Sequence, residues 1–199
     1  MNIKEPSVRL RIEGLLSIFC CEGNDMKKAA SIYLRTEICR RDVDRMICWM
    51  ESPNVIKYLS EDPNIVPWLK RLNASTPEPM LNYHFNRMGR FFMVCRRDED
   101  GVGFVRLMPA DGRNAYEIVY VIGEESLWGQ GLGESAVRCA QAQAFLEMRA
   151  ERMVAKIMPR NRRSIRCVCA CGFESAESSG ELLRFEMTSA AYFQRLREA

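Results

Sequence analysis

Three glycines stand at alternate positions in LWGQGLGES, residues 127–135. The preceding stretch AYEIVYVIG (115–123) predicts a strand, and the following residues 133–148 predict a helix. The first N–H groups of a helix have no intrahelical partner and lie at the positive end of its dipole, and glycine lets a ligand approach the main chain closely. A strand, a glycine loop and a helix N-terminus in this order therefore predict a site for a large anion. The alternative is a glycine-rich turn without a ligand.

Two nucleotide-binding patterns do not fit this loop. A P-loop needs a lysine after its last glycine, whereas Gly133 is followed by Glu134. The dinucleotide fingerprint G-x-G-x-x-G needs another glycine at position 134 or 136 and a strand that opens a βαβ unit. The loop therefore favours an anion held by the backbone in another kind of site.

Glu117 is the candidate proton acceptor of the chain. It lies eleven residues before Trp128 on the same predicted strand, between Tyr116 and Ile118. A carboxylate held among apolar side chains near an anion site is suited to general-base catalysis. A structural ion pair or an exposed position is the alternative interpretation of this residue.

The remaining pattern predicts an α/β fold with a mixed sheet and helices on its faces. The segment 62–89 has four prolines and predicts short helical turns and loops. Residues 1–30 predict an N-terminal extension of unclear role, and residues 31–199 the main domain. The strands are expected at 31–38, 90–96, 101–109, 115–123, 151–159 and 181–188, and the helices at 40–52, 53–61, 133–148, 161–173 and 189–199.

Composition excludes several classes of protein. The 199 residues include 47% apolar and 28% charged residues and carry a net charge of +3, too small to favour nucleic acid as a partner. No apolar run reaches the roughly 18 residues that span a bilayer, so no membrane association is expected. Nine cysteines without a secretory signal predict reduced thiols in a cytoplasmic protein rather than a disulfide scaffold. Cys167, Cys169 and Cys171 lack the spacing of a zinc site, so no metal is expected.

Three motifs in order carry a resemblance to a known family. The stretch VIGEESLWGQGLGES resembles the acetyl-CoA motif of the GNAT superfamily of N-acetyltransferases, R/Q-x-x-G-x-G/A, with Trp128 at the first position. Asn161, Ser164 and the pair Gly172-Phe173 resemble a downstream N-x-x-S-x(7)-G-F motif. The stretch 33–59 is similar to the opening strand and helix of the branch with ribosomal-protein N-terminal and many small-molecule acetyltransferases.

The resemblance implies a mostly antiparallel GNAT-like sheet that splays at the site of its co-substrate, acetyl-CoA. The pyrophosphate would take backbone N–H groups of the loop. Pantetheine would pair with the end of the central strand and with the amide of Asn161, and an N–H near Val121 would stabilise the oxyanion. The implied cofactor-binding residues are Val121, Ile122, Gly123, Trp128, Gly129, Gln130, Gly131, Leu132, Gly133, Glu134 and Asn161.

The same resemblance implies roles for two catalytic residues, Glu117 as the base and Ser164 as a hydrogen-bond donor to the sulfur. Ser164 could equally be a helix-start hydroxyl that serves the local backbone. Many superfamily members have a tyrosine acid seven residues after the asparagine, where this chain has Val168. Another base position of the superfamily is Lys156 here, which is unsuited to that role.

These expectations together predict an N-acetyltransferase that moves an acetyl group from acetyl-CoA to a small-molecule or peptide N-terminal amine. The acidic residues Glu51, Glu61, Asp62, Glu124 and Glu125 could line a groove for a cationic acceptor. A non-catalytic acyl-CoA-binding or regulatory module is the alternative. The sequence leaves open whether the chain forms a homodimer.

Overall fold

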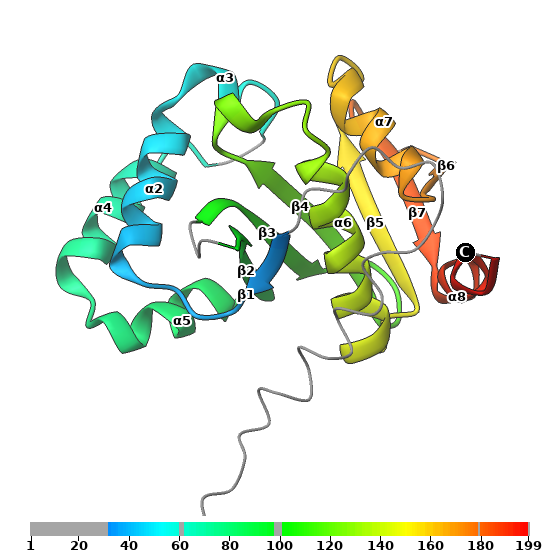
Figure 1. The fold of residues 1–199 in the computed structure, drawn as a ribbon, viewed down its shortest axis with the longest axis horizontal. Helices are drawn as coiled ribbons and strands as arrows, with labels where there is room; N and C mark the ends of the chain where they lie inside the picture. The colour runs from blue at the N-terminus through cyan, green and yellow to red at the C-terminus, as the bar shows by residue number, and fades with distance from the viewer. Residues whose placement is uncertain (1–31, 60–61, 98–100, 179, 199) are drawn as a thin grey trace, which may run out of the picture.

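The computed structural model describes residues 32–59, 62–97, 101–178 and 180–198 (Figure 1). The predicted extension 1–30 lies outside the described residues, so its boundary stays a prediction. The strands are β1 (Ile32–Arg35), β2 (Arg90–Arg96), β3 (Gly101–Pro109), β4 (Ala115–Ile122), β5 (Arg152–Ile157), β6 (Glu174–Ala176) and β7 (Leu183–Thr188). The helices are α2 (Arg40–Glu51), α3 (Pro53–Ile56), α4 (Ile65–Ser75), α5 (Glu78–Asn86), α6 (Leu132–Ala142), α7 (Arg162–Ala170) and α8 (Ser189–Glu198), with a 3₁₀ turn η1 (Glu125–Leu127) and a π-helical turn η2 (Gln143–Glu147).

The described strands form one sheet in the order β1-β2-β3-β4-β5-β7-β6. All neighbouring strands are antiparallel except β4 and β5, which are parallel. Two parallel strands need a crossover connection between them, and α6 is that connection between β4 and β5. The mixed, mostly antiparallel α/β fold is confirmed.

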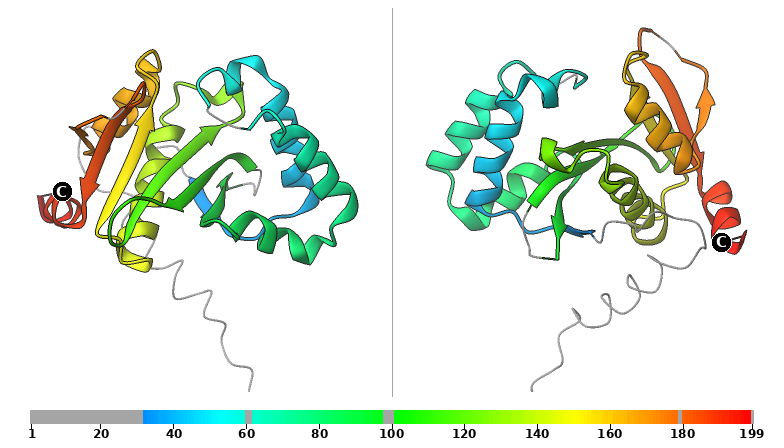
Figure 2. Two further views of the ribbon diagram at one scale, coloured as in Figure 1. Left: turned by 180° about the vertical axis from the view of Figure 1, so that it is seen from behind. Right: turned by 45° about the horizontal axis from the view of Figure 1, so that its top comes forward.

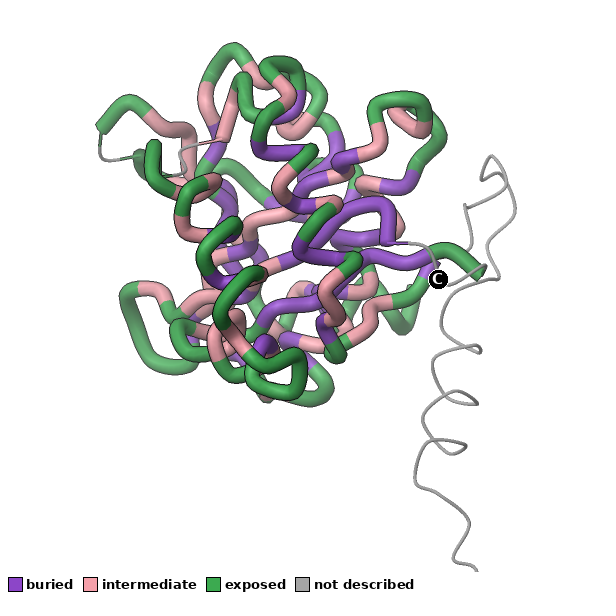
Figure 3. Tube along the Cα trace, turned by 90° about the vertical axis from the view of Figure 1, so that its left-hand side faces the viewer, coloured by how far each residue is buried: buried purple, intermediate pink, exposed green. Residues whose placement is uncertain are grey.

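Two buried clusters lie on opposite faces of the sheet. On one face, α6 packs Val137 and Ala140 against Ile118 of β4 and its neighbours. On the other face, α2, α4 and α5 contribute buried side chains that pack against β2 and β3, among them Trp49 of α2. Seen from behind, β4, β5 and β7 present a face that no helix covers (Figure 2). The buried stretches of the trace concentrate in the central strands (Figure 3).

The proline-rich segment differs from its prediction. It forms two full helices, α4 and α5, rather than short turns and loops. Pro67 is the third residue of α4 and Pro79 the second residue of α5. Proline is tolerated in a first helical turn because the N–H that it lacks has no partner there. The short strand β6 was also missed, since its three residues have no β-branched side chain.

Among the described residues, no helix is long and apolar enough to cross a membrane. Seven cysteines lie in this part of the chain, and all seven are free thiols. Cys95, Cys167 and Cys171 are buried, whereas Cys48 and Cys169 are exposed.

Candidate functional site

The parallel strands β4 and β5 pair over a short length and then diverge. Their register joins Ala115, Tyr116 and Glu117 to the start of β5, ending at Val154. Beyond this point β4 continues to pair with β3 as far as Ile122, and β5 with β7. The two arrows separate toward the end of the sheet that carries the glycine loop and α7 (Figure 1). Glu117 therefore sits where the two strands part.

The diverging edge of β4 exposes the backbone of alternate residues. The N–H of Gly123 donates to the carbonyl of Val102 in β3 at 2.9 Å. Backbone groups along a strand point alternately to its two sides, so Val121 also faces β3, whereas Tyr120 and Ile122 face the diverging side. Of the three residues expected to pair with pantetheine, only Ile122 directs its backbone groups to the diverging side. The backbone groups of Tyr120 point to the same side.

The glycine loop ends in a helix N-terminus that no side chain caps. Gly131 is the N-cap of α6, and both Gly129 and Gly131 have φ of 81°. This left-handed conformation is strained for residues with a Cβ. A Cβ at either position would meet nothing within 4 Å, so the space above both glycines is open. The N–H groups of Leu132 and Gly133 lie in the first turn, where they lack intrahelical acceptors.

Trp128 holds the loop rather than offering its amide to a ligand. Its backbone N–H donates to the carbonyl of Glu125 at 3.1 Å, and its indole N–H donates to the carbonyl of Ile122 at 2.7 Å. The guanidinium carbon of Arg163 in α7 lies 4.0 Å from the centroid of the indole ring, a cation–π contact. Trp128 thus connects the end of β4 to the start of α7.

Asn161 and Ser164 start α7 on the other side of the divergence. Asn161 is the N-cap, and its Oδ1 accepts the backbone N–H of Ser164 at 3.2 Å. The amide nitrogen of Asn161 has no acceptor among the described residues. Val168, at the position where the resemblance would place a tyrosine, is 0% exposed within the core. The predicted pattern at 161–173 is confirmed as a helix, and Gly172 ends it with φ of 90°.

A phenol that sequence reasoning did not single out lies beside Ser164. The hydroxyl of Tyr120 is 2.9 Å from Ser164 Oγ. Burial raises the pKa of Tyr120 far above its usual range, and the nearby Cys167 adds to this shift. A hydrogen bond from the thiol of Cys171 lowers the pKa of Cys167. Tyr120 packs on the α6 side, so the alternation of β4 was the signal that could have identified it.

Glu117 lies on the opposite face of β4 and is paired. Its carboxylate is 2.6 Å from the ammonium of Lys156, and the two side chains are 20% and 41% exposed. A structural ion pair was the alternative interpretation of Glu117. Glu117 can accept a proton in spite of this ion pair where the acceptor amine reaches its carboxylate beside Lys156.

The other wall of the site is built by α2 and α3. A Cβ at Gly123 would lie 2.1 Å from Cδ2 of Trp49, so only glycine allows this ring to pack on the end of β4. The indole N–H of Trp49 donates to Glu124 Oε1 at 3.1 Å. The contact of Trp49 with this junction was not predicted from the sequence.

Four of the five carboxylates expected to line an acidic groove already have partners. Glu125 accepts hydrogen bonds from Ser52 and Asn54, and these bonds lower its pKa. Glu51 pairs with Lys70 at 2.7 Å. Asp62 accepts from the backbone N–H and the side chain of Asn64, and Glu61 lies outside the described residues. These contacts weaken the argument for an acidic groove.

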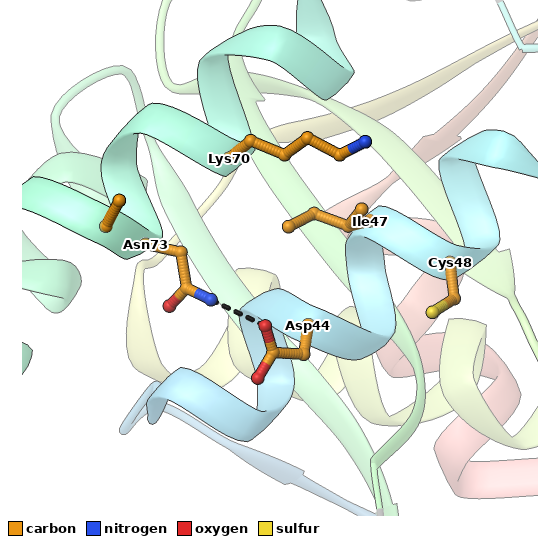
Figure 4. Close-up of a pocket in the computed structure, with 6 residues that line it drawn as sticks. Asp44, Ile47, Cys48, Lys70 and Asn73 are labelled. Carbon is orange, nitrogen blue, oxygen red and sulfur yellow. Dashed lines mark hydrogen bonds between the residues drawn. The ribbon is translucent and has the colours of Figure 1, made fainter.

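A groove of about 400 Å³ lies elsewhere, between α2 and α4 (Figure 4). It is lined by Asp44, Ile47, Cys48, Lys70, Asn73 and Ala74, and Asn73 donates to Asp44 across it at 2.6 Å. The residues of the β4–β5 divergence do not line it. This groove has no part in the site described above.

Comparison with solved structures shows the same fold in several acetyltransferases. Spermidine N-acetyltransferase from Vibrio cholerae, in complex with CoA and spermine, superposes with a TM-score of 0.67 at 18% identity, covering 81% of this chain and 98% of its own. An aminoglycoside acetyltransferase, AAC(6')-Ib with coenzyme A, gives 0.66 at 19% identity, covering 84% and 99%. A GNAT-family acetyltransferase from Bacillus anthracis gives 0.65 at 17% identity, covering 82% and 98%. No curated protein matches the sequence.

The family profile described as "Acetyltransferase (GNAT) domain" matches residues 32–174. This match spans most of the chain and includes both sides of the β4–β5 divergence, the glycine loop and α7. The expected resemblance is thereby confirmed at the level of the family, while the branch within it stays a prediction. The chain belongs to the GNAT family of acetyltransferases.

Proposed function

We propose that the protein transfers an acetyl group from acetyl-CoA to a primary amine by direct attack within a ternary complex. The observation that carries the proposal is the parting of β4 and β5 at Glu117, directly before an uncapped, glycine-led helix N-terminus. A thioester laid along the diverging edge would reach Glu117 with its acyl end while its phosphates occupy the loop. The acceptor is a small molecule or a protein N-terminal amine.

The loop geometry supports a defined pose for the cofactor. The pyrophosphate takes N–H groups from Gly129 to Glu134, where the φ values and open space allow close approach. The N–H of Ile122 and the amide nitrogen of Asn161 hold pantetheine from its two sides. The N–H of Tyr120 or Ile122 serves the oxyanion, because the polar groups of Val121 face β3.

The amine must lose its charge before it can attack. A lysine-like amine is neutral in about one molecule in 2,500 at pH 7, which costs roughly 4–5 kcal/mol. Glu117 accepts the proton as the nitrogen bonds to the acetyl carbon and the C–S bond breaks. The cationic Lys156 beside it disfavours a second positive charge at the same place, which helps to keep the bound amine neutral.

Charge on the open sheet face bears on the identity of the acceptor. Arg184 and Arg152 both contact Glu186, at 2.6 and 3.4 Å, on the face of β5 and β7 that carries Lys156. Together with Glu117, the ion pairs of this face join three cations and two carboxylates. An acceptor with several positive charges would be repelled there. The face favours an acceptor amine with few other cationic groups.

Relatives with the same fold were solved with acceptors that do carry several amines. The Vibrio cholerae enzyme holds spermine, and AAC(6')-Ib has been solved with kanamycin. The charge on the open face and the engaged carboxylates Glu51, Glu124 and Glu125 argue against a polycationic acceptor for this chain. Both kinds of amine therefore belong in the test.

The second candidate is a non-catalytic acyl-CoA-binding module. The Glu117–Lys156 ion pair favours it, because a carboxylate engaged by lysine has a structural explanation. Val168 in place of a tyrosine favours it as well. In this alternative the loop still binds acetyl-CoA, but no amine releases the thiol.

The deciding experiment measures thiol release from acetyl-CoA with a panel of amines. The panel comprises spermine, kanamycin, amino acids and their amides, and short peptides with a free N-terminus, each beside its N-acetylated form as a control. We expect release that saturates with acetyl-CoA and with at least one singly charged amine, together with a product heavier by one acetyl group. Tight acetyl-CoA binding without release by any amine would establish the non-catalytic module instead.

A further inference from the structure

We propose that Tyr120 is a positioning residue that orients the hydroxyl of Ser164, so that the Ser164 proton points to the thioester sulfur. The proposal rests on the acetyl transfer proposed above. It assigns a task to a buried phenol whose side chain has no part in the proposed cofactor pose.

The hydrogen bond between Tyr120 and Ser164 bridges the two sides of the divergence. Tyr120 comes from β4 and Ser164 from the first turn of α7, and their hydroxyls are 2.9 Å apart. The backbone of Ser164 is fixed separately through its N–H, which donates to Asn161. A Cβ at Gly133 would lie 3.5 Å from Cε2 of Tyr120, which places the ring directly beneath the glycine loop. The pair therefore lies next to the proposed path of pantetheine.

The direction of this hydrogen bond decides what Ser164 can do. A serine hydroxyl has one proton and can accept two bonds. If the phenol of Tyr120 donates to Ser164 Oγ, the serine proton is left for another acceptor. The thiol of Cys167 also lies near the phenol, but sulfur is the weaker acceptor. Since burial raises the pKa of Tyr120, the phenol keeps its proton and remains a donor throughout the cycle.

The step in which this matters is the departure of the thiol. The amine nitrogen bonds to the acetyl carbon, the C–S bond breaks, and its electron pair moves to sulfur while the amine proton passes to Glu117. The hydroxyl of Ser164 donates a hydrogen bond to the sulfur as negative charge builds there. The thiolate takes its proton from solvent on release, so Tyr120 loses none.

The arrangement explains how the site can work although Val168 stands where many superfamily members have a tyrosine acid. A tyrosine seven residues after the asparagine would start from the fully buried face of α7 that Val168 occupies here. In this chain a phenol enters from β4 and acts through Ser164 rather than on the sulfur itself.

The test compares Tyr120→Phe, Ser164→Ala and the double variant in the full chain, with Tyr116→Phe as the matched control. Tyr116 lies on the same face of the same strand and packs against the same core. We expect kcat to fall about tenfold in Tyr120→Phe, as for one lost hydrogen bond to a developing charge. The affinity for CoA, measured by calorimetry, is expected to stay within about twofold, and Tyr116→Phe to behave like wild type.

The double variant separates positioning from packing. If Tyr120 acts through Ser164, then Tyr120→Phe added to Ser164→Ala lowers kcat no further. Additive losses, or an unchanged kcat in Tyr120→Phe, would overturn the inference while leaving the acetyltransferase intact. An inactive wild type with every amine would instead refute the proposed function itself, so the two failures are distinguishable.

Discussion

On the α6–α7 side of β4, the groups offered to a ligand are largely backbone, whereas on the α2–α3 side they are side chains that already have partners. The N-terminus of α6 has no side-chain cap, and the space above its glycines is open. Across the strand, Glu124 is bound by Trp49, and Glu125 by two side chains of the α2–α3 junction. One side is thus prepared for a fixed ligand, and the other holds the wall of the site in place.

This difference follows from what each side must recognise. A pyrophosphate is the same in every reaction of the co-substrate, so backbone N–H groups and a helix dipole suffice for it. Acceptors differ between members of one fold, as the spermine and kanamycin complexes of the relatives illustrate. Specificity for them must come from side chains, whose partners depend on tertiary packing.

The largest effect is expected when the ion pair between Glu117 and Lys156 is disrupted, by replacing either residue. Glu117→Gln and Lys156→Gln remove the same contact, but only the first removes the proposed base. We expect kcat to fall by about 100- to 1,000-fold in Glu117→Gln and by far less in Lys156→Gln, which keeps the base and loses only the neighbouring cation, measured as thiol release with saturating amine. Equal losses in both variants would mean that Glu117 has only a structural role.

The backbone-built side was predictable because its requirements appear as residue types at fixed positions. Gly129 and Gly131 have the positive φ that favours glycine, and Asn161 caps α7. The mixed sheet and the helices α6 and α7 followed from such local patterns and are confirmed by the structure, and the family is confirmed by its profile match. The predicted roles of the individual site residues remain predictions.

The side-chain contacts of the site were less predictable because they join distant parts of the chain. Lys156 of β5 forms an ion pair with Glu117 of the neighbouring strand β4, and nothing in either local sequence indicates this pairing. Two helices replaced the loops expected at 62–89, since prolines in a first turn resemble helix breakers when only composition is considered. Tyr120 was overlooked, although the alternation of side chains along β4 places it on the sheet face opposite to that of Val121.

A smaller effect is expected at the loop itself, from Gly131→Asp. The new side chain would sit at φ of 81° in the open space where the pyrophosphate is proposed to bind, and its charge would repel that anion. We expect acetyl-CoA to bind roughly 10- to 100-fold more weakly in calorimetry. Gly180→Asp is the matched control, because Gly180 has φ of 100° and equally open surroundings outside α6. Equal affinity in both variants would remove the pyrophosphate from this loop.

The smallest effect on binding is expected where the two sides meet, at Gly123. A Cβ there would collide with the ring of Trp49, so Gly123→Ala should lower the free energy of unfolding by about 1–3 kcal/mol, measured by thermal and urea denaturation. Because the amide of Gly123 already donates to Val102, acetyl-CoA affinity should change less than about twofold. In a Trp49→Leu background the same substitution should cost much less, since the colliding ring is gone. A large loss of affinity with unchanged stability would instead place Gly123 in the cofactor site.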